Sequence, residues 1–165
     1  MNFRMLTAAG ALICAGLLAF AYYLQYVKGL EPCPLCLMQR GFFYGLMGTL
    51  VIATVHGRGN LLYGSIAALF AAGGLATAGR QVWLQHLPPE RVPACGPDLF
   101  FMLDNFPLSR VVTTLLKGTG ECAAVDWTFL GLSIAEWSAL WFAAFLVYAV
   151  WLAVRGSRML RVAAA

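Results

Sequence analysis

Residues 5–27 read MLTAAGALICAGLLAFAYYLQYV, a run of 23 residues without a charged side chain. A helix of about 20 apolar residues is long enough to cross the hydrocarbon core of a bilayer. Arg4 and the small residues Ala19 and Ala21 imitate a cleavable secretory signal, but the run continues through Tyr23 and is longer than a usual signal core. The stretch therefore predicts a retained membrane-spanning helix at the start of the chain.

Three further apolar runs follow, at residues 37–55, 61–79 and 134–154, the first of these with Gln39 and Arg40 near its start and the last with Glu136 near its start. They are rich in Ala and Gly, which lets membrane helices approach one another closely. Ser133 and Glu136 have the spacing of a capping box, which places Glu136 in a first helical turn rather than in lipid. The four runs predict an all-α fold, an integral membrane bundle of four transmembrane helices.

The composition agrees with a membrane protein. Of 165 residues, 61% are hydrophobic and 11% are charged, whereas about a quarter are charged in a typical soluble domain. We expect one membrane domain over residues 1–165, with lipid as part of its solvent. The net charge of +4 forms no basic patch, so no nucleic acid partner is expected.

The basic residues predict an orientation. Four spans place both termini on one side and the connections 28–36 and 80–133 on the other. Short segments on the terminal side carry the denser basic charge, and all seven acidic residues fall on the other side. Basic residues in short segments mark the cytoplasmic side, so both termini are predicted to be cytoplasmic. The basic residues counted on that side are Arg4, Arg58, Arg155, Arg158 and Arg161.

The long connection carries its own pattern. Apolar residues recur at helical spacing from Leu108 to Leu116, with Arg110 and Lys117 among the polar residues between and after them. This predicts a short amphipathic helix, either on the membrane surface or packed on the bundle. Trp83, Trp127 and Trp137 are interpreted as anchors at the membrane interface.

Cys33-Pro34-Leu35-Cys36 is a C-x-x-C pair, which is compatible with a redox pair, a structural disulfide or half of a zinc site. Zinc would need two more ligands, and no second C-x-x-C supplies them, so no metal is expected. The pair lies where the second span begins. Helix N-termini favour anions such as the reactive thiolate, and this position favours the redox interpretation.

Two residues are candidates for binding a cofactor. Arg40 lies four residues after Cys36, so the two share a helix face. Its guanidinium requires an oxygen-rich or anionic partner, which could be a quinone carbonyl near Cys36 or a lipid phosphate. His86 follows the third span and either lines a quinone pocket or lies hydrogen-bonded at the surface.

The remaining cysteines differ in setting. A disulfide between Cys95 and Cys122 would close a loop of about 27 residues, and it would act as a stabilising staple or as a second exchangeable pair. Glycine and proline flank these two residues, so the segments look irregular and accessible. Cys14 lies inside the first apolar run and is expected to be an inert buried thiol.

Together these features resemble the disulfide bond formation protein B (DsbB) family. The resemblance rests on four spans, the C-x-x-C at the start of the second, the Arg four residues beyond it, the cysteine pair in the long connection, and the stretches 120–122 and 126–132. It implies a bacterial inner-membrane protein-disulfide:quinone oxidoreductase that reoxidises a periplasmic DsbA-like thiol oxidase. The implied cofactor is a quinone, either ubiquinone or menaquinone.

The resemblance also implies an order of events. The partner attacks the Cys95–Cys122 disulfide and forms a mixed disulfide with Cys95. Cys122 then attacks Cys33, and Cys36 leaves as a thiolate beside the quinone. Arg40 holds the quinone and stabilises this thiolate. Exchange of this kind proceeds through thiolates and mixed disulfides.

Two other classes of membrane protein share part of this pattern. A vitamin K epoxide reductase-like protein also combines C-x-x-C with quinone chemistry, but its C-x-x-C falls before the last helix. A four-span adhesion or channel protein with purely structural loop disulfides, as in claudins, explains Cys95 and Cys122 but not the C-x-x-C with Arg40. A quinone bound to the purified protein would separate these classes.

Overall fold

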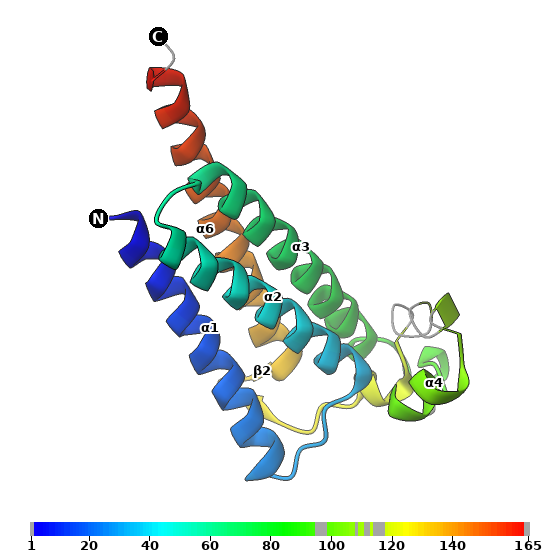
Figure 1. Cartoon of the computed structure of the whole chain (residues 1–165). Helices are drawn as coiled ribbons and strands as arrows, with labels where there is room; N and C mark the ends of the chain where they lie inside the picture. Colours follow the sequence, from blue (N-terminus) through cyan, green and yellow to red (C-terminus); the bar gives the residue numbers. More distant parts are fainter. Residues whose placement is uncertain (1, 95–98, 108, 111–112, 114–117, 164–165) are drawn as a thin grey trace.

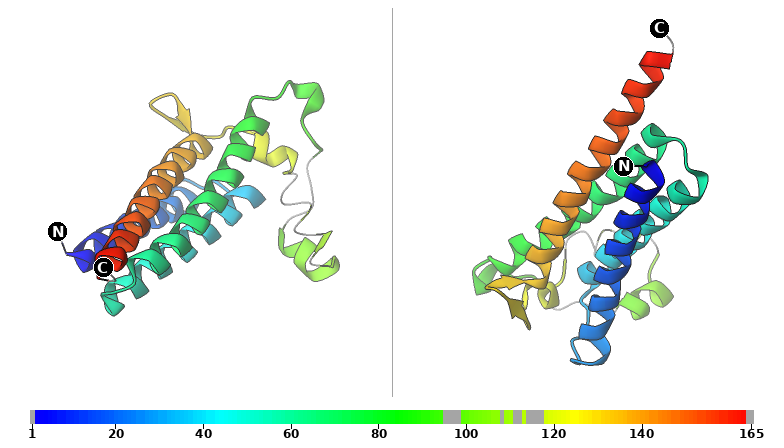
Figure 2. Two further views of the ribbon diagram at one scale, coloured as in Figure 1. Left: turned by 90° about the horizontal axis from the view of Figure 1, so that it is seen from above. Right: turned by 90° about the vertical axis from the view of Figure 1, so that its left-hand side faces the viewer.

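Four long helices form the bundle in the computed structural model, which describes residues 2–94, 99–107, 109–110, 113 and 118–163 (Figure 1). These helices are α1 (Phe3–Tyr26), α2 (Pro34–His56), α3 (Asn60–Gln85) and α6 (Ile134–Ala163). All four are long and apolar enough to cross a membrane, so the predicted all-α, four-span fold is confirmed. Both termini lie at one end of the bundle, and the connection between α3 and α6 lies at the other (Figures 1 and 2).

Two helices begin as their sequences predict. Cys33 is the extended N-cap of α2, and Pro34 occupies the first turn, where its missing N–H costs nothing. At the start of α6 the Ser133 backbone N–H donates to the Glu136 carboxylate at 2.7 Å, and the Glu136 N–H donates to the Ser133 hydroxyl at 3.3 Å. The predicted capping box is confirmed, and it fixes the entry of the chain into the last span.

Helix α3 extends six residues beyond the predicted end of its span at residue 79. Arg80 and Gln81 end the apolar run but not the helix. The Arg80 guanidinium lies 4.2 Å from the centre of the Trp83 ring, and the Gln81 side chain is buried. The long connection therefore begins at His86 rather than at residue 80, and the additional turns carry Gln81 to the start of α2.

The long connection contains short elements that the hydropathy pattern does not reveal. They are η1 (Pro89–Arg91), α4 (Leu99–Asn105), η2 (Gly120–Ala123), β1 (Thr128–Phe129) and β2 (Leu132–Ser133). The two strands pair antiparallel through Leu130 and Gly131, which both have positive φ, as a two-residue hairpin turn requires. The predicted amphipathic helix at 108–117 falls largely on residues outside those described.

Small residues bring α3 and α6 together. A Cβ atom on Gly64 would stand 2.6 Å from the Ala153 backbone nitrogen and 2.9 Å from the Ala149 carbonyl oxygen. About three helical turns further along α3, Gly74 faces the Phe142 ring. The predicted close approach of Gly-rich helices is confirmed at these positions, whereas Gly48 faces open space.

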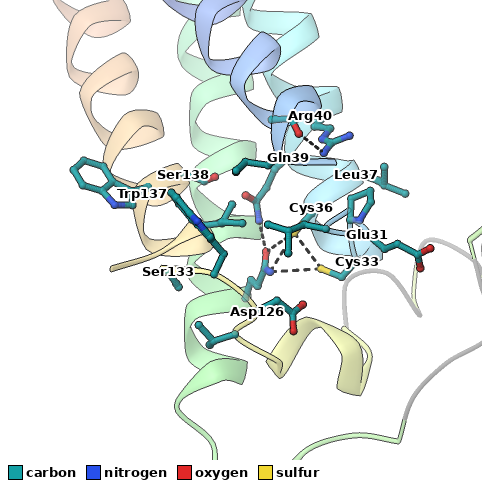
Figure 3. A pocket seen from close by; sticks show the side chains of 18 of the residues that line it. Glu31, Cys33, Cys36, Leu37, Gln39, Arg40, Asp126, Ser133, Trp137 and Ser138 are labelled. Carbon is teal, nitrogen blue, oxygen red and sulfur yellow. Dashed lines mark hydrogen bonds between the residues drawn. The ribbon is translucent and has the colours of Figure 1, made fainter. Parts of the chain in front are cut away.

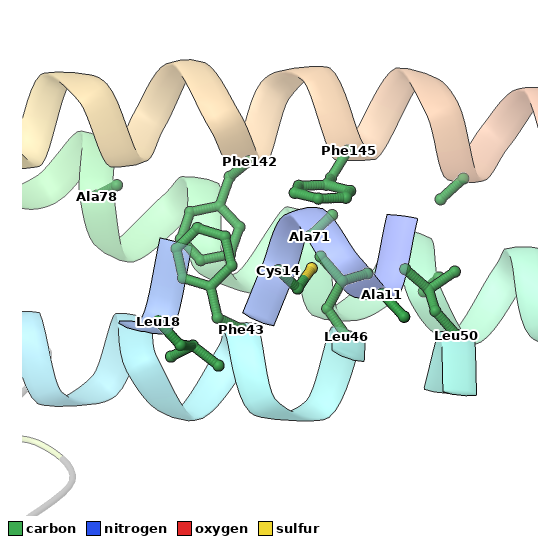
Figure 4. Close-up of a cluster of buried hydrophobic side chains, with 12 residues drawn as sticks. Ala11, Cys14, Leu18, Phe43, Leu46, Leu50, Ala71, Ala78, Phe142 and Phe145 are labelled. Carbon is green, nitrogen blue, oxygen red and sulfur yellow. The ribbon is translucent and has the colours of Figure 1, made fainter. Parts of the chain in front are cut away.

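The core lies along the centre of the bundle (Figure 4). The Phe43 and Phe142 rings stack with their centres 4.0 Å apart, and Phe145 packs edge-on against Phe43. Cys14 is fully buried in this cluster beside the aliphatic side chains of α1 and α2. Its predicted burial is confirmed, and it lies in the core rather than among the other described cysteines.

Candidate functional site

Three cysteines meet at the end of the bundle where α2 begins. Cys33 and Cys36 lie in the first turn of α2 with their Sγ atoms 3.2 Å apart. Cys122, in η2, is fully buried and packs with Leu35 and Leu84 in a cluster that Cys33 joins. All three are free thiols in this structure. Cys95 lies outside the described residues, so the structure gives no position for the fourth predicted redox cysteine.

The surroundings of Cys122 and Cys33 shift the pKa values of the two thiols in opposite directions. The side-chain contact with Cys33 lowers the pKa of Cys122 to about 6, against the opposing effect of burial. Backbone N–H groups of Leu35 and Thr119 act in the same direction as Cys33. The contact with Cys122, followed by that with Cys36, raises the pKa of Cys33. In the reduced cluster, these contacts favour ionisation of Cys122 over ionisation of Cys33.

A cavity of about 980 Å³ opens beside the cysteines (Figure 3). All four long helices and the segment from Glu121 to Ser133 contribute to its wall. Most of the wall is apolar, with aromatic rings from Trp127, Trp137 and Trp141. Such a cavity, apolar with a few convergent polar groups, is typical of a site for a small organic molecule.

Arg40 lies in the cavity wall, one turn deeper along α2 than Cys36. Its Nη1 donates to the Gln25 side-chain oxygen and its Nη2 to the Ala21 carbonyl at 3.2 Å. The guanidinium also lies 4.9 Å from the centre of the Tyr22 ring. These contacts with α1 hold the charge beside the cavity.

His86 is placed differently. It is the C-cap of α3, is exposed, and its Nδ1 lies 2.8 Å from the Val82 carbonyl oxygen. Within the part of the chain that the structure describes, it is not among the residues that line the cavity. Its geometry is that of the hydrogen-bonded surface residue, the second of the two interpretations of the sequence.

Known protein sequences match this chain over most of its length. The family described as "Disulfide bond formation protein DsbB" matches residues 3–152 of the chain.

The chain belongs to the DsbB family.

Individual relatives match over most of their length. A disulfide bond formation protein B of Marinobacter nauticus is 48% identical over 158 residues, which cover 94% of each chain. The protein of that name from Hahella chejuensis is 51% identical over 143 residues, covering 85% of this chain and 86% of the relative. That of Azoarcus sp. is 46% identical over 155 residues, covering 92% of each chain.

Within this DsbB chain, the structure adds polar residues to the site that sequence reasoning did not select. The buried amides of Gln39 and Gln81 are hydrogen-bonded to each other at 2.7 Å, and Gln81 contacts both sulfurs of the C-x-x-C. Gln39 lies inside the apolar run 37–55, where an amide needs a polar partner, and this signal could have identified it. Gln81 lies beyond the predicted span 61–79, so the sequence carries no such signal for it.

The aromatic residues of the DsbB chain also gain a second role. Trp127 and Trp137, interpreted above as interface anchors, line the cavity. Ring contacts run from Phe20 on α1 to Trp127, from Trp127 to Phe129, and from Phe129 to Trp137 on α6. They cover the cavity wall between the first and last spans.

Proposed function

We propose that this DsbB-family chain is a bacterial inner-membrane oxidoreductase that oxidises a soluble DsbA-like dithiol protein and passes the electrons to a membrane quinone. Membership of the family supports the general role in disulfide bond formation. One observation carries the finer proposal. Cys122 packs against Cys33, and the neighbouring Cys36 faces a large apolar cavity that Arg40 borders.

The thiol steps balance as follows. A partner thiolate attacks Cys95, forming one S–S bond and releasing Cys122 as a thiolate. The partner's second thiolate displaces Cys95, which leaves the partner oxidised. Cys122 attacks Cys33, and the Cys33–Cys36 bond breaks with its electron pair on Cys36. The Cys95 thiolate then attacks Cys122, which restores the Cys95–Cys122 disulfide and releases Cys33. The Cys33–Cys36 disulfide forms again when two electrons and two protons leave the protein.

Backbone N–H groups that lower the pKa of Cys122 support its role as the attacking group. Leu35 contributes one of them at the start of α2, where helix N–H groups lack partners within the helix. These groups still face the sulfur when Cys33 is in a disulfide and its thiol no longer donates, and the sulfur lies against the atom it must attack. Thiolates rather than thiols perform exchange.

The residues of the cavity fit a quinone. Aromatic and aliphatic side chains suit the ring and its hydrocarbon tail, and the Arg40 guanidinium suits a carbonyl oxygen. A quinone bound there supplies the two-electron acceptor. Cys36 lies in the same wall, so the sulfur that receives the electron pair faces the bound molecule.

Solvent extraction of the purified protein, followed by chromatography, tests the proposal directly. We expect bound ubiquinone or menaquinone, and quinol formation when a reduced DsbA-like protein is added. Cys33→Ala should abolish quinol formation without removing the bound quinone. If the chain forms no quinol and its disulfides are inert toward the partner, the alternative of purely structural loop disulfides is the better account.

A further inference from the structure

Gln81 places an amide against the two sulfurs of the C-x-x-C. Its Nε2 lies 3.3 Å from the Cys36 sulfur and 3.5 Å from the Cys33 sulfur. Figure 3 marks the hydrogen bonds at the labelled Cys36 and Cys33 with dashed lines. The side chain is 4% exposed and projects from the additional turns of α3. A buried amide in a membrane-spanning helix is costly unless both of its ends are satisfied.

Gln39 determines which end of that amide faces the sulfurs. The Gln39 Nε2 donates to the Gln81 Oε1 at 2.7 Å, and the Gln39 side chain is itself 3% exposed. The Cys36 sulfur lies 3.6 Å from this oxygen and 3.3 Å from the Gln81 Nε2. Because the oxygen accepts the shorter bond from Gln39, the NH₂ group is the end of the amide that is available to Cys36 and Cys33. An ionised sulfur accepts hydrogen bonds and has none to donate, so this orientation suits a thiolate.

Arg40 does not occupy this position. Its hydrogen bonds lead to Gln25 and to the Ala21 carbonyl on α1, away from the sulfurs. Among the side chains that the structure describes, the nitrogen donor on the Cys36 sulfur is the Gln81 amide. The resemblance to the family implied that Arg40 both holds the quinone and stabilises the thiolate, whereas here a different residue contacts the Cys36 sulfur.

We propose that Gln81 is a catalytic residue that stabilises the Cys36 thiolate, and that Gln39 is the positioning residue that orients its amide. The inference rests on the proposed function, in which Cys36 is the leaving sulfur. When Cys122 bonds to Cys33, the electron pair of the broken Cys33–Cys36 bond moves to Cys36. The Gln81 N–H already points at that atom, and a donor that needs no reorientation lowers the barrier to charge development.

Alkylation of Cys36 measures this interaction without partner or quinone. Full-length protein is fully reduced in detergent and treated with iodoacetamide at pH 7, and modification of Cys36 is followed by peptide mass mapping. Gln81→Met keeps the length of the side chain and removes the donor. Since a hydrogen bond to a charged group contributes about one to two factors of ten in an equilibrium, we expect Cys36 alkylation about tenfold slower or more.

Gln85→Met is the matched control. Gln85 lies one turn further along α3 and lines the same cavity, but its Oε1 accepts from the Ser133 hydroxyl at 2.8 Å. This variant should alkylate at Cys36 at the wild-type rate. Gln39→Met should give a smaller reduction than Gln81→Met, because the Gln81 amide remains but loses the contact that orients it.

The redox equilibrium gives an independent measurement. In glutathione buffers, the Gln81→Met protein should hold Cys33–Cys36 as the disulfide at a ratio [GSH]²/[GSSG] about tenfold higher than the wild type tolerates. Gln81→Asn retains the amide but withdraws it by one methylene. It should show the same direction of change, and it tests the proposal should the Met variant fail to fold.

Wild-type alkylation rates and a wild-type redox equilibrium in the folded Gln81 variants would overturn the assignment. An equal loss in Gln85→Met would overturn it too, because the effect would then belong to cavity polarity in general. A wild-type protein that forms no quinol would instead refute the proposed function, and the sulfur measurements would stand unaffected.

Discussion

At the scale of single residues, the polar and ionisable side chains of the site contact specific neighbours in the protein. Arg40 bonds to α1, Cys122 contacts Cys33 and two backbone N–H groups, and Gln81 contacts the C-x-x-C sulfurs. Each contact couples groups from different parts of the chain. Substitution of either partner should therefore change a measurable chemical property of the other, and not only stability.

The first prediction concerns Arg40. Arg40→Ala should lower kcat/KM for quinone by about tenfold or more, because a charge-assisted bond to a carbonyl oxygen is lost, while both disulfides still form. Arg40→Lys should restore kcat/KM for quinone only in part, since lysine lacks the planar guanidinium with its several N–H donors. Steady-state kinetics with varied quinone measure the effect. His86→Ala, outside the cavity wall, should behave as wild type, and unchanged quinone kinetics in Arg40→Ala would refute its role.

The second prediction concerns the titration of Cys122. Because contact with Cys33 lowers its pKa to about 6, the reduced protein should contain a thiolate that persists above this pH and is lost as the pH falls through it. Ultraviolet thiolate absorbance measures the titration, and Cys122→Ser assigns it by removing that component. In Cys33→Ala the midpoint should rise toward the ordinary cysteine value of about 8.5. A midpoint unaffected by Cys33→Ala would contradict the assigned cause.

At the scale of elements, the contact between α3 and α6 organises the bundle. Phe142 of α6 packs over Gly74 and stacks on Phe43 of α2, so one ring joins three helices. Lipid supplies no hydrophobic drive between helices, and close packing at small residues has to stabilise the pair instead. The same helix, α3, carries Gln81, so its placement also positions the site.

The third prediction uses two glycines. Gly64→Ala should destabilise the protein by about 1–3 kcal/mol, because its Cβ would meet backbone atoms of Ala153 and Ala149, which cannot move aside independently. Gly48→Ala makes the same change where nothing lies within 4 Å, and it should be neutral or slightly stabilising. Thermal unfolding in detergent compares the two. Equal melting temperatures would mean that α3 and α6 do not approach so closely.

At the scale of the whole molecule, the fold gathers the described thiols other than Cys14 at one end and the termini at the opposite end. If the thiol end faces the periplasm, exchange with a soluble partner and access to membrane quinone occur in one molecule. Cys122 is fully buried, so the partner's attack falls to Cys95 under the proposed mechanism. This arrangement, with the thiols at one end and the termini at the other, leads to two predictions.

The fourth prediction is a covalent trap. In Cys122→Ser, Cys95 is left without its partner, and exchange stalls when the onward thiol is absent. Mild oxidation with a DsbA-like oxidase that lacks its second active-site cysteine should give a stable complex through Cys95. Non-reducing gels and peptide mapping would identify the linkage. Crosslinking mainly to Cys33 or Cys36 would show that the loop pair is a staple and that the electron path is different.

The fifth prediction concerns orientation. Alkaline phosphatase, which is active only outside the cytoplasm, should be active when fused after His86 and inactive when fused at Gly57. The basic residues flanking the terminal side of the bundle are the physical reason. A cytoplasmic fluorescent reporter at the C-terminus provides the complementary measurement. The opposite pattern would place the cysteines in the reducing compartment and would contradict the proposed function.

Local sequence determined the spans, the capping box at Ser133, the position of the C-x-x-C at the start of α2, and the family. Hydropathy, caps and motif spacing act over a few turns of one helix, so they can be recognised without neighbours. The end of α3 was not predictable in this way, because Arg80 and Gln81 end an apolar run, whereas the contact of Gln81 with Gln39 on α2 stabilises the helix beyond that run.

The tertiary structure alone decided which residues meet. Gln81 reaches Cys36 across 45 positions of sequence, and η2 places Cys122 beside Cys33 through burial against Leu35 and Leu84. It also turned Trp127 and Trp137 toward the cavity and left His86 at the surface. These outcomes depend on how helices pack and where a long connection docks, and such contacts between distant residues leave no periodic pattern in a single sequence.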